Sequence, residues 1–400
     1  MAPDPLYAAA AQNRRARAAV AVLFLTNGAV FANLLPRYPE IKADLALSNA
    51  VYGAAVAAFS AGALVAGLTA AALIRRFRSS RVAVVGTIGI ATFVLLAGVA
   101  PSAALLAGAL FVAGACDAVT DVAQNAHGLR VQRNYGRSII NSFHAVWAVG
   151  AILGGMTGAA AIALDISRAV HLGAAAAVLS AVVIAAYPYL LPGPDHDDHP
   201  AAARTGGGGG AGVAVYATLL ALVVIAVAGA TIEDAGSSWA TLYLRDSLGA
   251  PGPLAAFGYV ALVGAMFVGR LIGDRFVDRF GERAVVRAGG FIAAAGMGVA
   301  LAVPSVPGTI AGFAAAGFGV ATLIPSAMHG ADQLPGLRPG TGLTAVTWLM
   351  RLGFFGAPLL VGLVADATSL RVGLLSVPIA GLVVVLLAGA LNARRRPSRS

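Results

Sequence analysis

The chain has 400 residues, of which 59% are hydrophobic and 11% charged, and its mean hydropathy is +0.84. A soluble domain is about 45–50% apolar and about 25% charged, so this composition excludes a soluble globular protein and predicts a polytopic membrane protein. The net charge of +10 would suggest a nucleic-acid partner in a soluble protein, but here the positions of the arginines matter more. The single cysteine, Cys116, excludes a disulfide framework.

Apolar stretches of about 20 residues are long enough to cross a bilayer. The N-terminus is polar and Arg14, Arg15 and Arg17 lead directly into the first stretch, so no cleavable signal peptide is expected. Twelve spans are predicted, near residues 16–36, 49–74, 82–100, 103–127, 139–163, 169–191, 213–233, 253–273, 284–303, 306–328, 341–365 and 370–391. The predicted fold is therefore an all-α polytopic membrane protein.

Arginine is distributed unequally between the two sides of the membrane. If the N-terminus is cytoplasmic, most arginines fall in inside loops, and the outside loops keep only Arg37, Lys42, Arg168, Arg245 and Arg371. Positive residues concentrate on the cytoplasmic side of membrane proteins. Both termini are therefore expected in the cytoplasm, with the chain in the cytoplasmic (inner) membrane, and the basic composition needs no nucleic acid.

Residues 192–212 contain prolines, a His196-Asp-Asp-His199 group and the glycine run Gly206 to Gly210. Such a composition cannot bury a core, so it predicts a flexible cytoplasmic linker between two six-helix bundles, 1–191 and 213–400. The His196–His199 group could bind a divalent metal, but a solvated linker is the favoured interpretation, because its Pro and Gly flanks preorganise nothing. No metal or cofactor is expected.

The two halves repeat. Arg76-Phe77 recurs as Arg279-Phe280, and Trp147, Gly155 and Asp165 recur at one common spacing as Trp348, Gly356 and Asp366. Matches at one spacing across a pair of spans indicate a duplicated six-span unit. Internal repeats of this kind are typical of transporter folds.

The fourth span carries a polar stripe. Asp117, Asp121, Gln124 and Asn125 are three and four residues apart, and so share one face of a helix. Unpaired polar groups are costly in lipid, so this face must point at protein or water. Asp121, whose second-half equivalent is Leu323, is the first candidate for a proton-coupling acid, and Asp117 is the second. The alternative is an interhelical structural contact.

Other polar or aromatic residues lie in or near the spans. His144 is a further proton-relay candidate, because neutral imidazole can both donate and accept; a structural hydrogen bond to the fourth span is the alternative. Asn27, Gln124, Asn125 and Arg351 are candidates for lining the substrate cavity. Trp147 and Trp348 occupy equivalent repeat positions and either line the cavity or pack an interface.

Glu233 and Asp234 end the apolar run of the seventh span, and both are proton-coupling candidates. Arg351 stands inside the eleventh span, where a lone arginine needs a partner. Glu233, Asp234 or a carboxylated substrate could serve. A Glu233–Arg351 pair could hold a cavity closed, or it could be a static neutralised pair.

Two six-helix halves with basic inside loops resemble the major facilitator superfamily. The segment from Gly269 through Asp274-Arg275 to Asp278-Arg279-Phe280-Gly281 is similar to that superfamily's G-x-x-x-D-R-x-G-R-R loop signature. The resemblance implies that Asp274, Arg275, Asp278, Arg279 and Gly281 form a conformational latch against the start of the fifth span. The matching first-half segment 74–78 has neither Asp nor Gly, so that latch is missing there.

A finer resemblance is to the MosC/YbjJ-like branch, which includes proteins implicated in transport of rhizopine, an inositol-type amine. The residues that carry it are Asp121-Val-Ala-Gln-Asn125, Gly136-Arg137-Ser138, Ser142-Phe143-His144-Ala145, Glu233, Ala235, Trp239 and Leu242-Tyr243-Leu244. Trp239 joins the cavity candidates. Ser238 precedes it where the resemblance leads us to expect an acid.

These observations predict a monomeric, proton-coupled secondary transporter that works by alternating access on a small polar solute, of sugar, cyclitol or amino-cyclitol type. One rival is a multidrug or hydrophobic-cation exporter of the same fold, which would need a more aromatic cavity than 7% aromatic residues suggest. A second rival is a non-transporting membrane sensor or assembly module. An enzyme is not expected, because no nucleophile elbow, phosphate loop or metal-ligand spacing is present.

Overall fold

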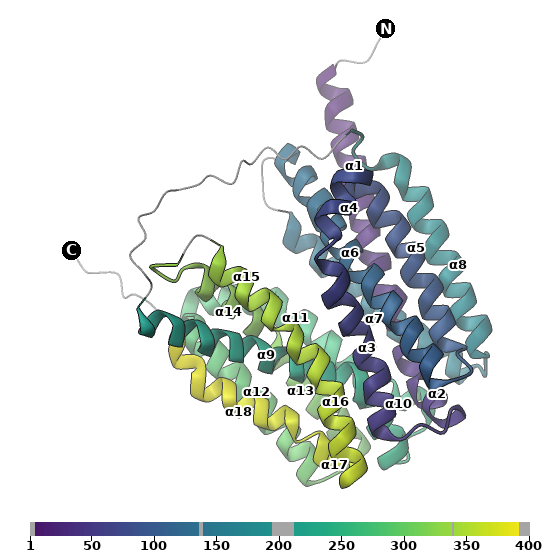
Figure 1. Ribbon diagram of the computed structural model, residues 1–400, viewed down its shortest axis with the longest axis vertical. Coiled ribbons are helices and arrows are strands. Elements are labelled where there is room, and N and C mark those ends of the chain that lie inside the picture. The colour runs from purple at the N-terminus through teal and green to yellow at the C-terminus, as the bar shows by residue number, and fades with distance from the viewer. Residues whose placement is uncertain (1–4, 136–138, 194–211, 338–339, 392–400) are drawn as a thin grey trace. The chain divides into compact units, whose positions relative to one another are not determined.

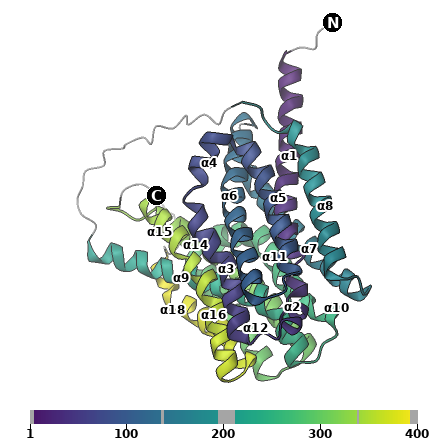
Figure 2. The same cartoon turned by 45° about the vertical axis from the view of Figure 1, so that its right-hand side comes forward.

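The computed structural model describes residues 5–135, 139–193, 212–337 and 340–391. The regular elements of these residues are helices (Figures 1 and 2). Twelve helical segments are long and apolar enough to cross a membrane, which confirms the predicted fold class and number of spans. Most of the predicted linker at 192–212, its His196–His199 group and the Gly136–Ser138 motif lie outside the described residues.

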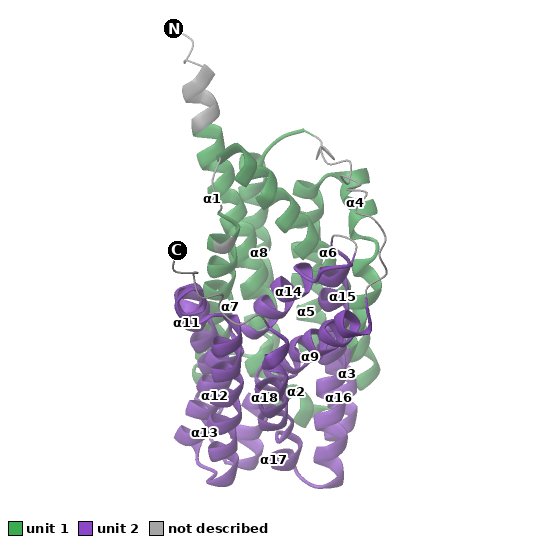
Figure 3. Ribbon diagram, turned by 90° about the vertical axis from the view of Figure 1, so that its left-hand side faces the viewer, with its two compact units in different colours: residues 1–47, 58–200 green, residues 48–57, 201–400 purple. Residues whose placement is uncertain are grey.

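The chain divides into two compact units, residues 1–47 with 58–200 and residues 48–57 with 201–400 (Figure 3). The first half of the chain contains α1 (Pro5–Ala32), η1 (Leu35–Arg37), α2 (Tyr38–Asp44), α3 (Asn49–Gly67), α4 (Ala70–Phe77), α5 (Ser79–Gly98), α6 (Ala103–Tyr135), α7 (Ile140–Ala163), α8 (Arg168–Ala186) and η2 (Tyr187–Tyr189). Within it, α5 packs against both α6 and α8 (Figures 1 and 2).

The second half contains α9 (Val213–Leu242), η3 (Tyr243–Ser247), α10 (Gly252–Ala255), α11 (Phe257–Phe280), α12 (Glu282–Ala302), α13 (Val306–Val320), α14 (Leu323–Asp332), α15 (Thr341–Leu349), α16 (Arg351–Ala367), α17 (Leu370–Gly373), α18 (Ser376–Leu387) and η4 (Ala388–Ala390). Here α12 lies beside α18, and α9 beside α16 (Figure 1).

The first turns of α3 belong to the second unit, although the linker-based prediction placed them in the first. The Tyr52 hydroxyl donates to the Ser238 carbonyl at 2.7 Å, and its ring meets Trp239 edge-on at 4.9 Å between centroids. The Asp366 carboxylate accepts from the backbone N–H groups of Asn49 and Ala50, both at 2.8 Å. These contacts cap the start of α3, which explains why residues 48–57 group with α9 and α16.

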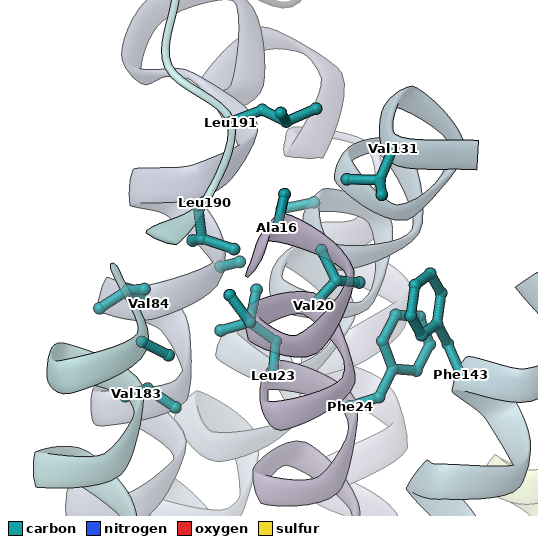
Figure 4. Packing of buried hydrophobic residues seen from close by; sticks show 14 of the residues in the cluster. Ala16, Val20, Leu23, Phe24, Val84, Val131, Phe143, Val183, Leu190 and Leu191 are labelled. Carbon is teal, nitrogen blue, oxygen red and sulfur yellow. The ribbon is translucent and has the colours of Figure 1, made fainter. Parts of the chain in front are cut away.

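A hydrophobic cluster fills the first unit at the level of the middle turns of α1. Val20, Leu23 and Phe24 of α1 are fully buried and meet side chains from α5, α6, α7 and α8 (Figure 4). Phe24 stacks on Phe143 of α7, with ring centroids 5.4 Å apart. Stacked aromatic pairs stabilise beyond their buried area, so this cluster fixes where α1 meets α7.

Serines begin several helices as N-caps. Ser167, Ser305 and Ser369 accept from the backbone N–H three residues later, at the starts of α8, α13 and α17. Such bonds satisfy donors that the first helical turn leaves free. They mark the short turns that separate successive spans.

Several predicted spans differ from the observed helices. The second is interrupted at Leu68 and Thr69, between α3 and α4, the tenth at Ala321 and Thr322, between α13 and α14, and the eleventh at Met350, between α15 and α16. The seventh, predicted to end at 233, continues as α9 to Leu242. Much of the second half of α9 is buried, Asp234 included, so the two acids face protein and are accommodated within the helix.

Candidate functional site

The candidate site lies in the first unit, where α1, α6 and α7 meet. Glycines allow α1 and α7 to approach closely: a Cβ added at Gly28 would lie 2.1 Å from the Trp147 carbonyl oxygen, and one at Gly150 would lie 2.0 Å from the Leu25 carbonyl oxygen. Small residues at helix contacts permit such backbone approach in membrane proteins. The approach brings Trp147 within hydrogen-bond reach of Asn27.

Asn27 is the centre of a hydrogen-bond network. Its Oδ1 accepts from Trp147 Nε1 at 2.8 Å and from Gln124 Nε2 at 3.5 Å, and its Nδ2 donates to Asp117 Oδ1 at 3.1 Å. An indole N–H can only donate, which fixes the orientation of the Asn27 amide. Asn27 is 5% exposed, so this side chain links three helices from within the unit.

The polar stripe of α6 continues the network. Asp121 Oδ1 accepts from Asn125 Nδ2 at 2.9 Å and from Gln124 Nε2 at 3.5 Å. Gln124 is fully buried, and its Oε1 has no hydrogen-bond partner among the described residues. A buried acceptor without a donor is costly. The structure thus brings together Asn27, Asp117, Asp121, Gln124, Asn125 and Trp147, which we call the α6 polar cluster.

His144 is exposed on α7, and its ring meets Phe24 of α1 edge-on, with centroids 5.2 Å apart. Phe24 stands one turn before Asn27 on α1. His144 is therefore a neighbour of the cluster through an aromatic contact.

Glu233 and Asp234 lie inside α9, and not at its end as predicted. Asp234 is 8% exposed; its Oδ1 accepts from Ser238 Oγ at 3.1 Å, and its Oδ2 has no hydrogen-bond partner among the described residues. Glu233 lies close enough to Arg270 of α11 for their charges to interact. The second unit therefore holds two acids in the interior of a membrane-spanning helix.

The structure does not bring Arg351 and Glu233 together. Arg351 is the first residue of α16, directly after the interruption at Met350, and the ion pairs of the described residues include none that joins it to Glu233. Trp239 is fully buried on α9. Trp348 is 47% exposed on α15, whereas Trp147 donates to Asn27 within the α6 polar cluster, so the tryptophans at equivalent repeat positions have different surroundings.

The latch candidates occupy the last turns of α11. Asp274, Arg275, Asp278 and Arg279 are exposed. Gly281 ends the helix with φ +84°, a conformation that favours glycine. Their predicted contact with the start of the fifth span stays a prediction.

A second polar network of the first unit was not predicted. Arg37 is 3% exposed; it donates to Glu40 at 2.9 Å and to His171 Nδ1 at 3.4 Å. Asn33 Oδ1 meets His171 Nε2 at 2.9 Å and accepts from Thr157 Oγ1 at 2.8 Å. This network was not evident from the sequence, because the partners of His171 come from other segments of the chain. The four-residue spacing of Asn33 and Arg37 was the only sign of it in the local sequence.

Relatives with similar sequences cover nearly the whole chain. An uncharacterized transporter, y4wD, of Sinorhizobium fredii is 30% identical over 376 residues, which cover 93% of this chain and 97% of the relative. The membrane protein MosC of Rhizobium meliloti is 27% identical over 92% of this chain and 88% of the relative. These matches confirm the resemblance to the MosC-like branch.

Solved structures show the same fold. The nucleoside transporter NupG superposes with a TM-score of 0.72 at 13% identity, covering 95% of this chain and 98% of NupG. The fucose:proton symporter FucP of E. coli gives a TM-score of 0.59 at 17% identity, covering 93% and 97%. The family model that describes the Major Facilitator Superfamily matches residues 20–331. Members of this family are transporters and not enzymes, and this chain belongs to the Major Facilitator Superfamily.

Proposed function

We propose that this protein is a proton-coupled transporter of a small hydroxylated solute, of sugar, cyclitol or amino-cyclitol type. The observation that carries the proposal is the α6 polar cluster. It joins two carboxylates, three amides and an indole from three membrane-spanning helices. Helix packing alone does not require such a polar group, whereas ionisable residues inside a membrane mark substrate or proton pathways.

Asp121 and Asp117 are the proposed proton-binding groups of the first unit. Ionised carboxylates are costly inside a membrane, so a proton or a cationic substrate group stabilises them. Both acids accept hydrogen bonds from amides of the same cluster. Protonation at Asp121 would therefore change the bonding of Gln124 and, through it, of Asn27. Glu233 and Asp234 are a second proposed proton site, within α9.

The same cluster supports a polar, ring-shaped substrate. Gln124 Oε1 is an acceptor without a partner among the described residues, and carboxylates accept from hydroxyl or ammonium donors. Trp147 offers a ring face for stacking on the apolar face of a sugar or cyclitol. NupG and FucP act on a nucleoside and on fucose, which also carry hydroxyl groups. Their likeness is one of fold, so the substrate class rests on these side chains.

The distribution of arginine supports an inner-membrane location with both termini in the cytoplasm. Alternating exposure of the cluster to the two sides would use the pseudo-symmetric halves that the sequence repeat indicates. We propose that a single chain is the transporting unit, because all members of the α6 polar cluster come from one unit of one chain.

A ligand screen tests the substrate class. Purified protein in detergent is heated with glucose, fucose, myo-inositol and an amino-inositol, and in parallel with tetraphenylphosphonium. Ligands that bind the folded state raise the melting temperature by mass action. We expect stabilisation by at least one polyol. Stabilisation by tetraphenylphosphonium alone would indicate the exporter, and no response to any polyol would contradict the proposed class.

Coupling is tested with the stabilising polyol in proteoliposomes that contain a pH-sensitive dye. Addition of the polyol outside should acidify or alkalinise the lumen in proportion to the substrate moved. Substrate movement without any change in luminal pH would contradict proton coupling and leave the substrate class intact.

A further inference from the structure

An open trough lies between α11 and α12. Both helices pack closely along α13 and little against each other. Phe318, Gly319 and Thr322 form its floor, and its volume is about 410 Å³. It lies within the second unit and is separate from the acids of α9.

The length of the trough corresponds to one leaflet of a bilayer. Its wall on α11 extends from Gly269 to Phe280, which is about 17 Å at 1.5 Å rise per residue. Half of a hydrocarbon core is about 15 Å. The trough ends at the turn at Gly281, on the side that the arginine distribution assigns to the cytoplasm.

The lining suits hydrocarbon. Phe276 and Phe280 stack along α11 with centroids 6.0 Å apart, and they are 44% and 51% exposed. The facing wall on α12 carries exposed alanines, Ala284 and Ala288. Thr322 is the one polar side chain of the lining. Large aromatics on one wall and small alanines on the other leave a slot with almost no hydrogen-bonding groups for a polar solute.

A cation stands at the turn end of the trough. The Arg279 guanidinium lies 5.5 Å from the centroid of the Phe280 ring, so it is in contact with the lining itself. The nearby carboxylate of Glu282 is bonded to His329 of α14. The Arg283 guanidinium lies beside Gly389 of η4. At about 100° per residue, Asp274 and Asp278 lie on the far side of α11 from the lining residues Gly269, Gly273, Phe276 and Phe280. The charged group in contact with the lining is therefore the Arg279 guanidinium, at the end of the trough that the arginine distribution assigns to the cytoplasm.

We propose that the trough binds one acyl chain of an anionic phospholipid, whose phosphate contacts Arg279. A trough with an apolar lining and the length of one leaflet favours a lipid acyl chain. A guanidinium at the end of the trough where the lipid headgroup would lie favours a negatively charged phosphate group. A polar substrate finds no partners there, and a zwitterionic lipid gains less from the cation. No residue of this lipid site belongs to the α6 polar cluster.

Native mass spectrometry of the purified full chain tests the site, with phosphatidylglycerol and phosphatidylcholine of identical acyl chains. We expect the wild-type protein to retain one phosphatidylglycerol about tenfold more tightly than phosphatidylcholine. Ala288→Trp fills the slot and should lose that lipid. Ala302→Trp, at an exposed position at the far end of α12, is the matched control and should keep it.

The headgroup contact is tested separately. Arg279→Gln should still bind a lipid but bind phosphatidylglycerol and phosphatidylcholine equally. Arg76→Gln removes the equivalent arginine, which lies over Phe77 in the first half, and should leave the preference unchanged. Ala284→Leu replaces Ala288→Trp if the latter fails to fold. Equal wild-type affinity for both lipids, retention of phosphatidylglycerol by the filled variants, or an undiminished preference in Arg279→Gln would each overturn the proposal.

Discussion

The two halves of the chain close equivalent hairpins with the same backbone but different residues. Arg78 joins α4 to α5 with φ 75° and ψ 144°, and Gly281 joins α11 to α12 with φ 84° and ψ 152°. Before each turn, an arginine lies over a phenylalanine ring, at 5.7 Å for Arg76–Phe77 and 5.5 Å for Arg279–Phe280. The duplication has kept the geometry of this turn even where its residue no longer favours it.

The fourth spans of the two halves, in contrast, share neither their helix geometry nor their polar residues. In the first half α6 is continuous and carries Asp121 within the α6 polar cluster. In the second half the helix is interrupted at Ala321 and Thr322, and the equivalent residue, Leu323, is fully buried. In the second unit, two acids stand instead in the interior of α9. The geometry of the turn at Arg78 and Gly281 was thus retained in both halves, while the polar residues of the helix interiors lie on different helices.

The largest expected effect concerns Asp121, the residue that separates the two fourth spans. Asp121→Asn mimics a permanently neutral carboxyl and should abolish proton-driven accumulation, while substrate exchange across the membrane remains. Proteoliposomes with and without an imposed pH gradient measure both. Asp165→Asn, an exposed acid of the same half, is the matched control. Normal coupled uptake by Asp121→Asn would remove this residue from the mechanism.

Substitutions at the two turn residues, Arg78 and Gly281, should change the free energy of unfolding in opposite directions. Gly281→Ala places a Cβ at a positive φ and should destabilise the protein by about 2 kcal/mol. Arg78→Gly should stabilise it by about 1 kcal/mol, because relief of strain exceeds the extra backbone entropy of glycine. Unfolding by SDS titration in mixed micelles measures both. A loss of stability in Arg78→Gly would show that its side chain, and not the turn, holds this hairpin.

The repeat-equivalent tryptophans give a third comparison. Trp147→Phe removes the donor to Asn27 Oδ1 within a buried network and should cost about 1.5 kcal/mol of unfolding free energy. It should also weaken binding of the stabilising polyol. Trp348→Phe, at a half-exposed position, should change stability by less than about 0.5 kcal/mol. Equal losses at both positions would contradict the network.

The smallest effect is expected at the repeat-equivalent acids. Asp366→Asn replaces one of the two oxygens that cap α3 with an amide donor, and should cost about 1 kcal/mol. Asp165→Asn should be close to neutral, because Asn tolerates the positive φ of 52° that Asp165 adopts. Hydrogen exchange at the Asn49 and Ala50 amides should accelerate in Asp366→Asn alone. Unchanged exchange there would show that the cap does not hold the start of α3.

The sequence by itself determined the number of spans, the duplication and the polar stripe of α6, because length, hydropathy and three- or four-residue spacing are properties of single helices. It missed the interruption of the tenth span and the continuation of α9 past its acids, since local composition does not report what packs around a helix. Glu233 and Arg351 were a plausible pair by charge, but although α9 lies beside α16, no ion pair in the part of the chain that the structure describes joins these two side chains.

Only the tertiary structure decided which side chains meet. Asn27 became the centre of the α6 polar cluster because Gly28 and Gly150 let α1 and α7 approach closely. His171 is buried where Arg37 and Asn33 bond to its two ring nitrogens. The first turns of α3 joined the second unit through Asp366. Each of these contacts joins residues far apart in the chain, so its energy depends on helix packing that no local pattern of residues encodes.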